Sequence, residues 1–423
     1  MADIYIDRGL TSVKLFGVKH SPAAYAIRDF LQRSVVPFDW IELQTDQEAR
    51  TLAGVDNLRD RRLPVCLFSD GTRLEAPTTR SLADRLGWVT QPIHKEYDVS
   101  IYGAGPGGLS AAVYAASEGL KCVLIEKSAI GGQAGTSSKI ENYLGFPGGI
   151  SGADLAERAR QQAVHFGAEI LLVREGIRAE FADGRIVVDL AGGGKLIAKT
   201  NICATGVDYR RLELQDEDRF LGAGVYYGAG VSEASMCMGE HVYIVGGGNS
   251  AGQAAAHLSQ FASHVTMLLR GESLAASLSQ YLVEKINLTP NIRVLPGAVV
   301  TGLYGGSALD SISILDVNKG TDEVVNTHHL FVCIGGLPNT EWAKDTSIIR
   351  DKQGYLVTGS DLSIGGRWPD TWPLSREPYM LETSVPGSFA VGDVRHGSVK
   401  RVASAVGEGA MAIQFVHRHL QRS

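Results

Sequence analysis

A short strand, a glycine-rich turn and a helix follow one another twice in this chain, and this repeated order constrains the fold more than any other feature. The first copy is the apolar run 97–102 followed by the turn Gly103-Ala104-Gly105-Pro106-Gly107-Gly108. The second copy is the apolar run 242–245 followed by the turn Gly246-Gly247-Gly248-Asn249-Ser250-Ala251. Glycines let such a turn approach a pyrophosphate closely, and the pyrophosphate then lies at the amides of the helix N-terminus. The sequence therefore predicts two nucleotide-binding sites.

An acidic residue completes the first copy. The apolar strand 123–125 ends at Glu126, about twenty residues after the turn, where a carboxylate can accept hydrogen bonds from ribose hydroxyls. A glycine pattern alone is a weak signal, but strand, glycines, helix, strand and acid in this order are a strong one. We therefore predict that this copy binds a dinucleotide through Gly103, Gly105, Pro106, Gly107, Gly108, Glu126 and Lys127.

The segment before the first copy has a different pattern. Its predicted elements are strand 13–16, helix 24–32, strand 37–43, strand 63–68 and a last helix ending near Gly87. This order resembles the thioredoxin/glutaredoxin fold, whose cis-proline would be Pro64 and whose CPxC would fall at Ser21-Pro22-Ala23-Ala24. Both cysteines are missing there. We predict a docking or dimer-stabilising unit in preference to a serine chemistry at Ser21, because no activating base is visible.

From Tyr97 to His419 the chain resembles the low-molecular-weight thioredoxin reductases. Four signatures stand in the order of that family: Ile130-Gly131-Gly132-Gln133 with Ile140-Glu141-Asn142-Tyr143, Ala204-Thr205-Gly206, Phe331–Gly335 with Pro338-Asn339-Thr340, and Phe389–Val394. The resemblance implies FAD at the first copy and a homodimer. It also implies FAD contacts from Gly132, Gln133, Asn142, Ala204, Thr205, Gly206, Gly392, Asp393 and, at the start of the last helix, Arg401, Val402 and Ala403.

The reactive dithiol of that family has no counterpart at the matching positions. The two cysteines would fall at Gly228 and Val231, and the acid that follows them would fall at Ser232. The five cysteines are Cys66, Cys122, Cys203, Cys237 and Cys333, and they include no CxxC. Cys237 follows shortly after this stretch, but one thiol cannot cycle as an intrachain disulfide. We interpret it as a packing residue.

The second copy departs from the family at the end of its second strand. NADPH-using members carry HRR there, which binds the 2′-phosphate, whereas this chain has Leu269-Arg270-Gly271. One arginine remains, and no carboxylate of the kind found in NAD sites ends the strand. This favours NADPH over NADH and leaves another ligand, even a second flavin, open. The predicted binding residues are Gly246, Gly248, Asn249, Ser250, Ala251 and Arg270.

Composition and charge argue against nucleic-acid-binding, membrane-spanning and secreted proteins. The net charge of -6 gives no basic patch for nucleic acid, and no apolar run reaches the roughly 20 residues needed to cross a bilayer. The N-terminus is not a secretory signal, and an odd number of isolated cysteines is typical of the cytoplasm. No metal site is predicted. The stretch from Ile364 to Met380 is longer than in the family, and we interpret it as a packed surface loop, with a lid or a dimer contact as the alternative.

These features predict an α/β fold with two Rossmann-like domains of thioredoxin reductase type behind a small thioredoxin-like domain. The predicted domains are 1–92, then 96–210 with 335–423 for FAD, and 211–334 for NAD(P). The leading hypothesis is an oxidoreductase that passes electrons from NAD(P)H through FAD to an acceptor that is not a disulfide. The alternatives are a ferredoxin/flavodoxin–NADP reductase-like enzyme, a non-catalytic flavin sensor or scaffold, and a disulfide reductase using a partner's cysteines. No side chain is predicted as catalytic.

Overall fold

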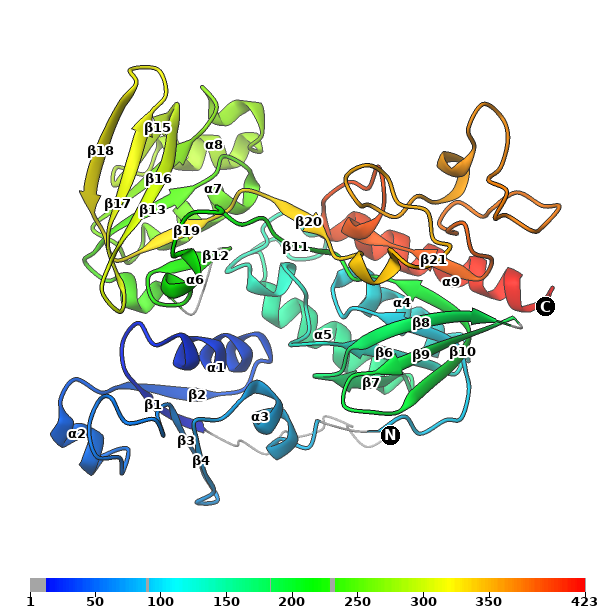
Figure 1. Cartoon of the computed structure of the whole chain (residues 1–423), viewed down its shortest axis with the longest axis horizontal. Coiled ribbons are helices and arrows are strands. Elements are labelled where there is room, and N and C mark those ends of the chain that lie inside the picture. The colour runs from blue at the N-terminus through cyan, green and yellow to red at the C-terminus, as the bar shows by residue number, and fades with distance from the viewer. Residues whose placement is uncertain (1–12, 89–90, 183, 229–232, 423) are drawn as a thin grey trace.

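The computed structural model describes residues 13–88, 91–182, 184–228 and 233–422. Figure 1 shows three lobes: the blue N-terminal lobe, a green and yellow lobe above it, and a third lobe that combines cyan and green segments with the red C-terminus. We call them the N-terminal unit, the second nucleotide unit and the first nucleotide unit, respectively. They follow the predicted order of folds along the chain, while the exact domain boundaries stay a prediction.

The N-terminal unit is a four-stranded sheet with the order β2-β1-β3-β4 and three helices. Strand β1 is parallel to β2 and antiparallel to β3, as a β-α-β start followed by a hairpin requires. The elements are β1 (Val13–Gly17), α1 (Pro22–Arg33), β2 (Phe38–Glu42), α2 (Asp46–Thr51), β3 (Val65–Phe68), β4 (Arg73–Glu75) and α3 (Thr79–Arg85). The peptide bond between Leu63 and Pro64 is cis, as predicted.

Helix α1 begins two residues before the predicted start because of its capping residues. The side chain of Ser21 accepts a hydrogen bond from the backbone N–H of Ala24, and Pro22 takes the first helical position, where no N–H is needed. Its buried face includes Ala24, Ile27 and Leu31, which follow the helical period.

The first nucleotide unit contains a seven-stranded sheet with the order β7-β6-β5-β10-β9-β8, and β21 also pairs with β10. Strands β7, β6, β5, β10 and β21 are parallel to their neighbours, whereas β9 and β8 form an antiparallel hairpin. The strands are β5 (Tyr97–Tyr102), β6 (Cys122–Glu126), β7 (Glu169–Leu172), β8 (Gly176–Ala182), β9 (Arg185–Leu190), β10 (Lys195–Cys203) and β21 (Ser388–Ala390). The helices are α4 (Pro106–Ser117), α5 (Gly152–His165) and α9 (Val402–Leu420), with short 3-10 helices at η1 (Ala134–Thr136), η4 (Glu341–Ala343), η5 (Gly359–Leu362) and η6 (Gly392–Val394).

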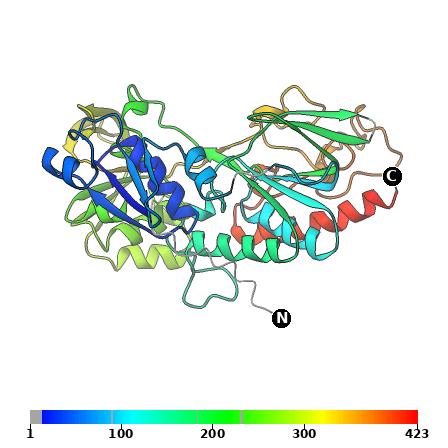
Figure 2. The same cartoon turned by 90° about the horizontal axis from the view of Figure 1, so that it is seen from below.

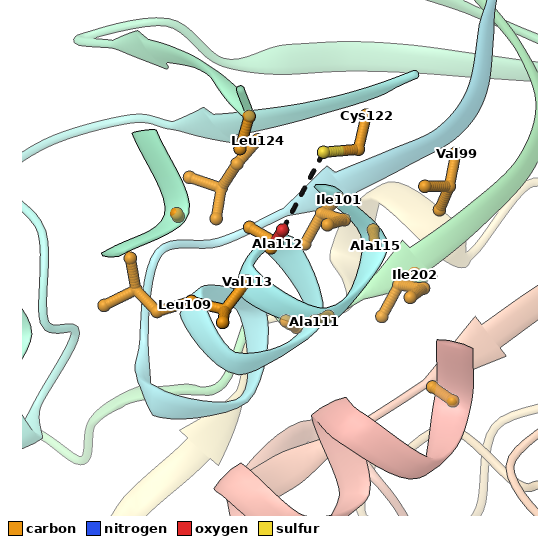
Figure 3. Close-up of a cluster of buried hydrophobic side chains, with 14 of the residues drawn as sticks. Val99, Ile101, Leu109, Ala111, Ala112, Val113, Ala115, Cys122, Leu124 and Ile202 are labelled. Atoms are coloured by element: carbon orange, nitrogen blue, oxygen red, sulfur yellow. Dashed lines mark hydrogen bonds between the residues drawn. The ribbon is translucent and has the colours of Figure 1, made fainter. Parts of the chain in front are cut away.

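The alanine-rich helix α4 lies in the core of this unit. Figure 3 shows its apolar side chains beside Val99, Ile101 and Ile202 of the sheet, and the Cys122 thiol 3.9 Å from the carbonyl oxygen of Ala112. Figure 2 shows α9, in red, running alongside the cyan helices under the sheet. The two helices approach closely because Gly409 faces the backbone of Gly107: a Cβ at Gly409 would lie 2.2 Å from the Gly107 oxygen. The start of α9 also meets the start of α4, because a Cβ at Gly107 would lie 3.2 Å from the carbonyl oxygen of Ala405.

The second nucleotide unit has a five-stranded parallel sheet with the order β12-β19-β13-β14-β15. A three-stranded antiparallel sheet, β16-β17-β18, packs against it through shared buried side chains. The strands are β12 (Val225–Tyr227), β13 (His241–Val245), β14 (His264–Leu269), β15 (Ile292–Pro296), β16 (Ala298–Gly305), β17 (Leu309–Asp316), β18 (Thr321–Asn326) and β19 (Leu330–Val332). The helices are α6 (Glu217–Phe220), α7 (Asn249–Leu258) and α8 (Gln280–Asn287), with η2 (Ala234–Cys237) and η3 (Leu274–Ala276).

Two chain segments connect the nucleotide units and pair with each other. Strand β11 (Val207–Tyr209) runs antiparallel to β20 (Gly336–Pro338), and both lie between the two lobes in Figure 1. Gly335 N-terminal to β20 has a positive φ of 89°. The chain therefore leaves and re-enters the first nucleotide unit at one place, next to the turn Ala204-Thr205-Gly206.

The long stretch from Ile364 to Met380 packs as a surface loop on the first nucleotide unit. Arg376 forms two hydrogen bonds to the buried carboxylate of Glu382, at 2.7 and 2.8 Å, and lies 4.1 Å from the ring of Tyr379. Tyr379 in turn stacks on Phe415 of α9. The structure thus favours the surface-loop interpretation over the lid.

Candidate functional site

A cavity of about 900 Å³ is lined by the glycine turn of the first nucleotide unit and by that of the second. We call it the central cavity. Its lining comes from all three units, and most of it from the first nucleotide unit. A volume of this size is within the range that holds a large organic ligand.

The first glycine turn is shaped by contacts that exclude side chains. Gly103 has a φ of +103°, and a Cβ there would lie 2.4 Å from the carbonyl oxygen of Ala204. A Cβ at Gly108 would lie 1.9 Å from the oxygen of Gly103. At Gly105, by contrast, no described atom lies within 4 Å of such a Cβ. Two glycines therefore let the backbone pack, and one leaves open space beside the turn.

The carboxylate of Glu126 ties this turn to the end of β6. It is 7% exposed, and its oxygens accept hydrogen bonds from the backbone N–H of Ala104 and of Ser128, both at 2.8 Å. Gly105 is the N-cap of α4 and, in the described structure, no side chain caps that helix end. Free amides, open space at Gly105 and a carboxylate beside them fit the pyrophosphate and ribose of a dinucleotide.

The loop that follows β6 lies directly against this turn. The backbone N–H of Gly131 donates to the oxygen of Ala104 at 2.7 Å. The side chain of Gln133 donates to the carbonyl of Val207 at 2.7 Å, which ties the loop to β11. Predicted flavin-contacting residues of this loop thus meet the turn Ala204-Thr205-Gly206 at one edge of the central cavity.

A further part of the cavity wall, next to the first glycine turn, is formed by η6 and the start of α9. Burial raises the pKa of Asp393, and the charge of Glu408 adds to this while that of Lys400 opposes it. The Lys400 ammonium donates to the Asp393 backbone oxygen at 2.7 Å. Arg401 is the N-cap residue of α9 and, in the described residues, this helix end also has no side-chain cap. A positive helix end therefore faces the cavity.

Nearly all of the predicted FAD residues meet in the central cavity. The lining includes Gly103, Gly105, Pro106, Gly107, Glu126, Lys127, Gly132, Gln133, Asn142, Ala204, Thr205, Gly206, Gly392, Asp393, Arg401 and Val402. Gly108 is absent from that lining because it packs beneath Gly103, and Ala403 is absent because it faces solvent. Gly108 supports the turn and Ala403 is exposed, and their part in FAD binding stays a prediction.

The second glycine turn opens onto the same cavity with only part of its predicted set. Gly248, Asn249 and Ser250 line it. Gly246 instead packs on the backbone of Cys333, where a Cβ would lie 2.3 Å from the carbonyl oxygen, and Ala251 is fully buried. Arg270 is exposed and lies outside the lining.

Several residues that line the cavity were not predicted from the sequence, because they lie far along the chain from the glycine turns. They include Arg33, Arg174, Tyr209, Tyr281 and Cys333. Arg33 comes from α1 of the N-terminal unit, and Arg174 is 1% exposed. Local pattern could not have found them, because what brings them to the cavity is tertiary packing.

The stretch predicted to replace the dithiol is partly described. Gly228 has a φ of +88°, and a Cβ there would lie 2.5 Å from the hydroxyl oxygen of Tyr209. This hydroxyl is 3.1 Å from Oγ1 of Thr136, and burial raises the pKa of Tyr209 to about 12. Val231 and Ser232 lie outside the described residues.

All five cysteines are buried and in the thiol form. Burial raises the pKa of each to about 12, so that the reactive thiolate is disfavoured. Cys237 belongs to the core of the second nucleotide unit. Among the described residues, no group of three or more potential metal ligands comes together, and no helix is both long enough and apolar enough to cross a membrane.

Comparisons with known proteins agree with this geometry. The profile of the pyridine nucleotide-disulphide oxidoreductase family matches residues 97–409. A thioredoxin reductase of Treponema pallidum (strain Nichols) is 33% identical over 317 residues, which cover 75% of this chain and 95% of the relative.

Two solved structures are similar over the same part of the chain. The thioredoxin reductase of T. acidophilum superposes with a TM-score of 0.68 at 29% identity, covering 77% of this chain and 99% of that chain. The Lactococcus lactis thioredoxin reductase, in a conformation named FR, gives a TM-score of 0.69 at 27% identity, covering 77% and 100%. The family match begins at residue 97, so the N-terminal unit lies outside it.

Proposed function

Because this chain belongs to the pyridine nucleotide-disulphide oxidoreductase family and is a thioredoxin reductase-like, FAD-dependent NAD(P)H oxidoreductase, we propose that it passes electrons from FAD to an acceptor that is not a disulfide. The acceptor is a small molecule or an electron-transfer protein. The comparisons show the family and its FAD-dependent activity, and the class of acceptor is what we propose.

The observation that carries the proposal is the contact between Gly228 and Tyr209. Gly228 stands where the resemblance places the first cysteine, and the Tyr209 hydroxyl occupies the space into which a side chain would extend. The sequence has no CxxC, and all five thiols are buried with raised pKa values. A dithiol relay next to the cavity therefore lacks both its cysteines and the room for the first of them.

The chain's own residues would hold FAD in the central cavity. The α4 amides at Gly105 would bind the pyrophosphate, Glu126 would accept from the ribose, and Asp393, beside the start of α9, would line the same site. FAD, when bound, supplies the two-electron chemistry. The positive end of α9 favours negative charge that develops near it. We propose the predicted set as FAD-binding residues, with Gly108 acting through the turn that it supports.

The second turn would hold the nicotinamide dinucleotide. Asn249 and Ser250 line the cavity at the start of α7, whose N-cap Gly248 carries no side-chain cap in the described structure. Arg270 follows β14 and is free to meet a 2′-phosphate, which favours NADPH over NADH. We also propose a thioredoxin-like fold without active-site cysteines for the N-terminal unit, a homodimer, a cytoplasmic location, and the predicted domain boundaries.

Anaerobic titration of the purified protein tests the electron donor and the acceptor class together. We expect NADPH to bleach the flavin absorbance, at lower concentration than NADH, and little reduction of a disulfide dye without an added partner. Robust dye reduction that is lost in Cys237→Ser would contradict the missing relay. Absence of bleaching by either nucleotide would instead fit a flavin sensor, a second bound flavin, or reduction by ferredoxin.

Alanine variants at two matched glycines test separately which ligand each turn binds. Gly105 and Gly248 are both N-caps with φ of -71° and -89° and ψ of 179°, and an added Cβ meets no described atom within 4 Å at either. Both alanine variants should therefore fold. We expect Gly105→Ala to lose flavin, and Gly248→Ala to keep flavin while its KM for NADPH rises. Equal flavin content in the two variants would contradict the assignment of the first turn.

A further inference from the structure

An arginine from outside the family match reaches the central cavity. Arg33 is the last residue of α1 in the N-terminal unit, and it lines the cavity together with the first glycine turn. Its Nη2 donates to the carbonyl oxygen of Ala129 at 3.1 Å and to that of Gly132 at 3.4 Å. These two carbonyls belong to the loop that the resemblance places against the flavin. The N-terminal unit thus bonds directly to the cofactor-binding loop.

The rest of α1 is held against the second nucleotide unit. Arg28 is 4% exposed and its Nη2 lies 3.7 Å from Oε1 of the fully buried Glu233, while its Nη1 lies 3.1 Å from the sulfur of Met236. One turn earlier, the ring of Tyr25 lies 5.5 Å from that of Tyr226. These contacts fix the helix from the other side, so that the position of Arg33 is determined by both nucleotide units.

The guanidinium of Arg33 is only partly satisfied. Its side chain is 16% exposed, and its buried Nε has no hydrogen-bond partner among the described residues. The neighbouring acid is Asp29, whose Oδ2 is 3.5 Å from Nη1 and whose side chain is 30% exposed. This leaves a positive charge at the cavity wall that one carboxylate offsets in part.

We propose that Arg33 is a positioning residue of the FAD site, which holds the loop 129–132 in place and supplies a positive charge to the cavity, so that the cysteine-free N-terminal unit is a component of the active site. The proposal rests on FAD occupying the central cavity. A reduced flavin carries more negative charge than an oxidised one, and a cation fixed in a partly buried site stabilises that added charge. Arg33 therefore favours the reduced cofactor.

The midpoint potential of the bound flavin tests the proposal in the full-length holoprotein. It is measured by anaerobic photoreduction against reference dyes, with neither a pyridine nucleotide nor an acceptor present. We expect Arg33→Gln to weaken the preference for reduced over oxidised flavin about tenfold, which for two electrons is a fall of about 30 mV. Arg33→Lys keeps the charge and should retain most of the potential. Arg59→Gln removes an exposed arginine of the same unit and should change nothing.

The neighbouring acid supplies a test in the opposite direction. Asp29→Asn removes the offsetting carboxylate and should raise the potential, and this variant carries the test if Arg33→Gln cannot be isolated with flavin bound. Potentials, flavin spectra and FAD Kd values of the Arg33 and Asp29 variants that equal those of Arg59→Gln would overturn the proposal. Because these readouts involve no acceptor, they stand whether or not the proposed acceptor class is correct.

Discussion

The two nucleotide units build the same strand, turn and helix but stabilise the turn by different means. In the first, the buried carboxylate of Glu126 accepts from the backbone of the turn. In the second, two neutral side chains link the turn to the segment 277–279: Ser277 donates to the oxygen of Gly247 at 2.8 Å, and Asn249 of the turn accepts from the N–H of Ser279 at 2.8 Å. The first turn thus depends on a charged side chain, whereas the second is closed by a neighbouring segment and leaves Arg270 at the surface.

The N-terminal unit also contacts the two nucleotide units by different chemistry. Toward the first, Arg80 donates to the backbone oxygen of Val173 at 2.6 Å, and this contact does not titrate near neutral pH. Toward the second, the contact includes the ion pair of Arg28 with Glu233 and two histidine rings, His20 and His329, with centroids 5.5 Å apart. The second interface is therefore the one that depends on charge state.

The largest difference in unfolding free energy should come from substitutions that weaken these two interfaces. Glu233→Gln removes the buried carboxylate that lies 3.7 Å from Arg28, which should lower the free energy of unfolding by about 3–5 kcal/mol. Arg80→Gln removes a hydrogen bond to a carbonyl and should lower it by about 1 kcal/mol. Urea unfolding of the apoproteins, followed by tryptophan fluorescence, measures both. Equal losses would show that the two interfaces are energetically alike.

Acid should weaken the second interface through its two histidines. Burial lowers the pKa of His20 to about 4 and that of His329 to about 3; Lys19 and His328 add to the lowering in both cases, and Arg28 does so at His20, where Asp310 opposes it. In the unfolded chain both titrate near 6.5. Between pH 6.5 and 4 the unfolded state therefore binds more protons, so stability is complete above pH 6.5 and decreases as the pH falls.

The expected loss by pH 4.5 is about 3–4 kcal/mol, because two pH units below 6.5 correspond to about 2.7 kcal/mol for the buried His329 and the partly exposed His20 adds less than that. Calorimetry from pH 8 to 4.5 gives the apparent Tm. The matched variant His329→Gln should show a shallower dependence on pH. A wild-type profile that is flat across this range would contradict the placement of the two rings.

Substitutions at the last position of each glycine turn compare how tightly the two turns are packed. Gly108→Ala places a Cβ 1.9 Å from the Gly103 oxygen, where neither backbone can yield, and should lower stability by about 2 kcal/mol and reduce flavin content. The corresponding position in the second unit is already Ala251, whose Cβ lies 3.4 Å from a Cβ built at Gly246. Ala251→Gly should lower stability by about 1 kcal/mol or less. Tolerance of Gly108→Ala with full flavin content would remove this distinction.

The smallest expected effects are on nucleotide affinity, and they come from the charged residues at the ends of β6 and β14. Glu126→Gln loses charge-assisted hydrogen bonds, and the FAD Kd should rise about tenfold, or about 1.4 kcal/mol. Arg270→Gln should leave FAD binding unchanged and raise the KM for NADPH about fivefold, with no effect on NADH. Fluorescence titration of FAD and steady-state kinetics measure these values. An equal effect on both nucleotides would mean that Arg270 does not meet the 2′-phosphate.

Local order in the sequence predicted much of this structure. Both strand-turn-helix copies have the predicted sequence of elements, because apolar periodicity and glycine at positive φ act over a few residues. Gly108 and Ala403 show the limit: the pattern marks a turn or a helix start, but which residue faces the ligand depends on rotation and packing. The hairpins β8–β9 and β16–β18 were not predicted.

Arg33 shows a second limit. The amphipathic pattern of α1 identifies a buried face, but not the partner that covers it, and Arg33 is separated from its partner Ala129 by 96 positions. No local feature of an arginine at the end of a surface helix distinguishes it from a solvated one. Contacts between units are therefore the part of the site that had to come from the structure.

The contact of Tyr209 with Gly228 bears on how this lineage can change. Under the proposed alignment, a single substitution that restores cysteine at position 228 meets both a left-handed backbone and a phenol already in place. Shortening the tyrosine first would empty a buried space with no immediate benefit. Installing a thiol at this place therefore requires coordinated substitutions at positions 209 and 228, because neither change alone provides both the cysteine and the room for its side chain.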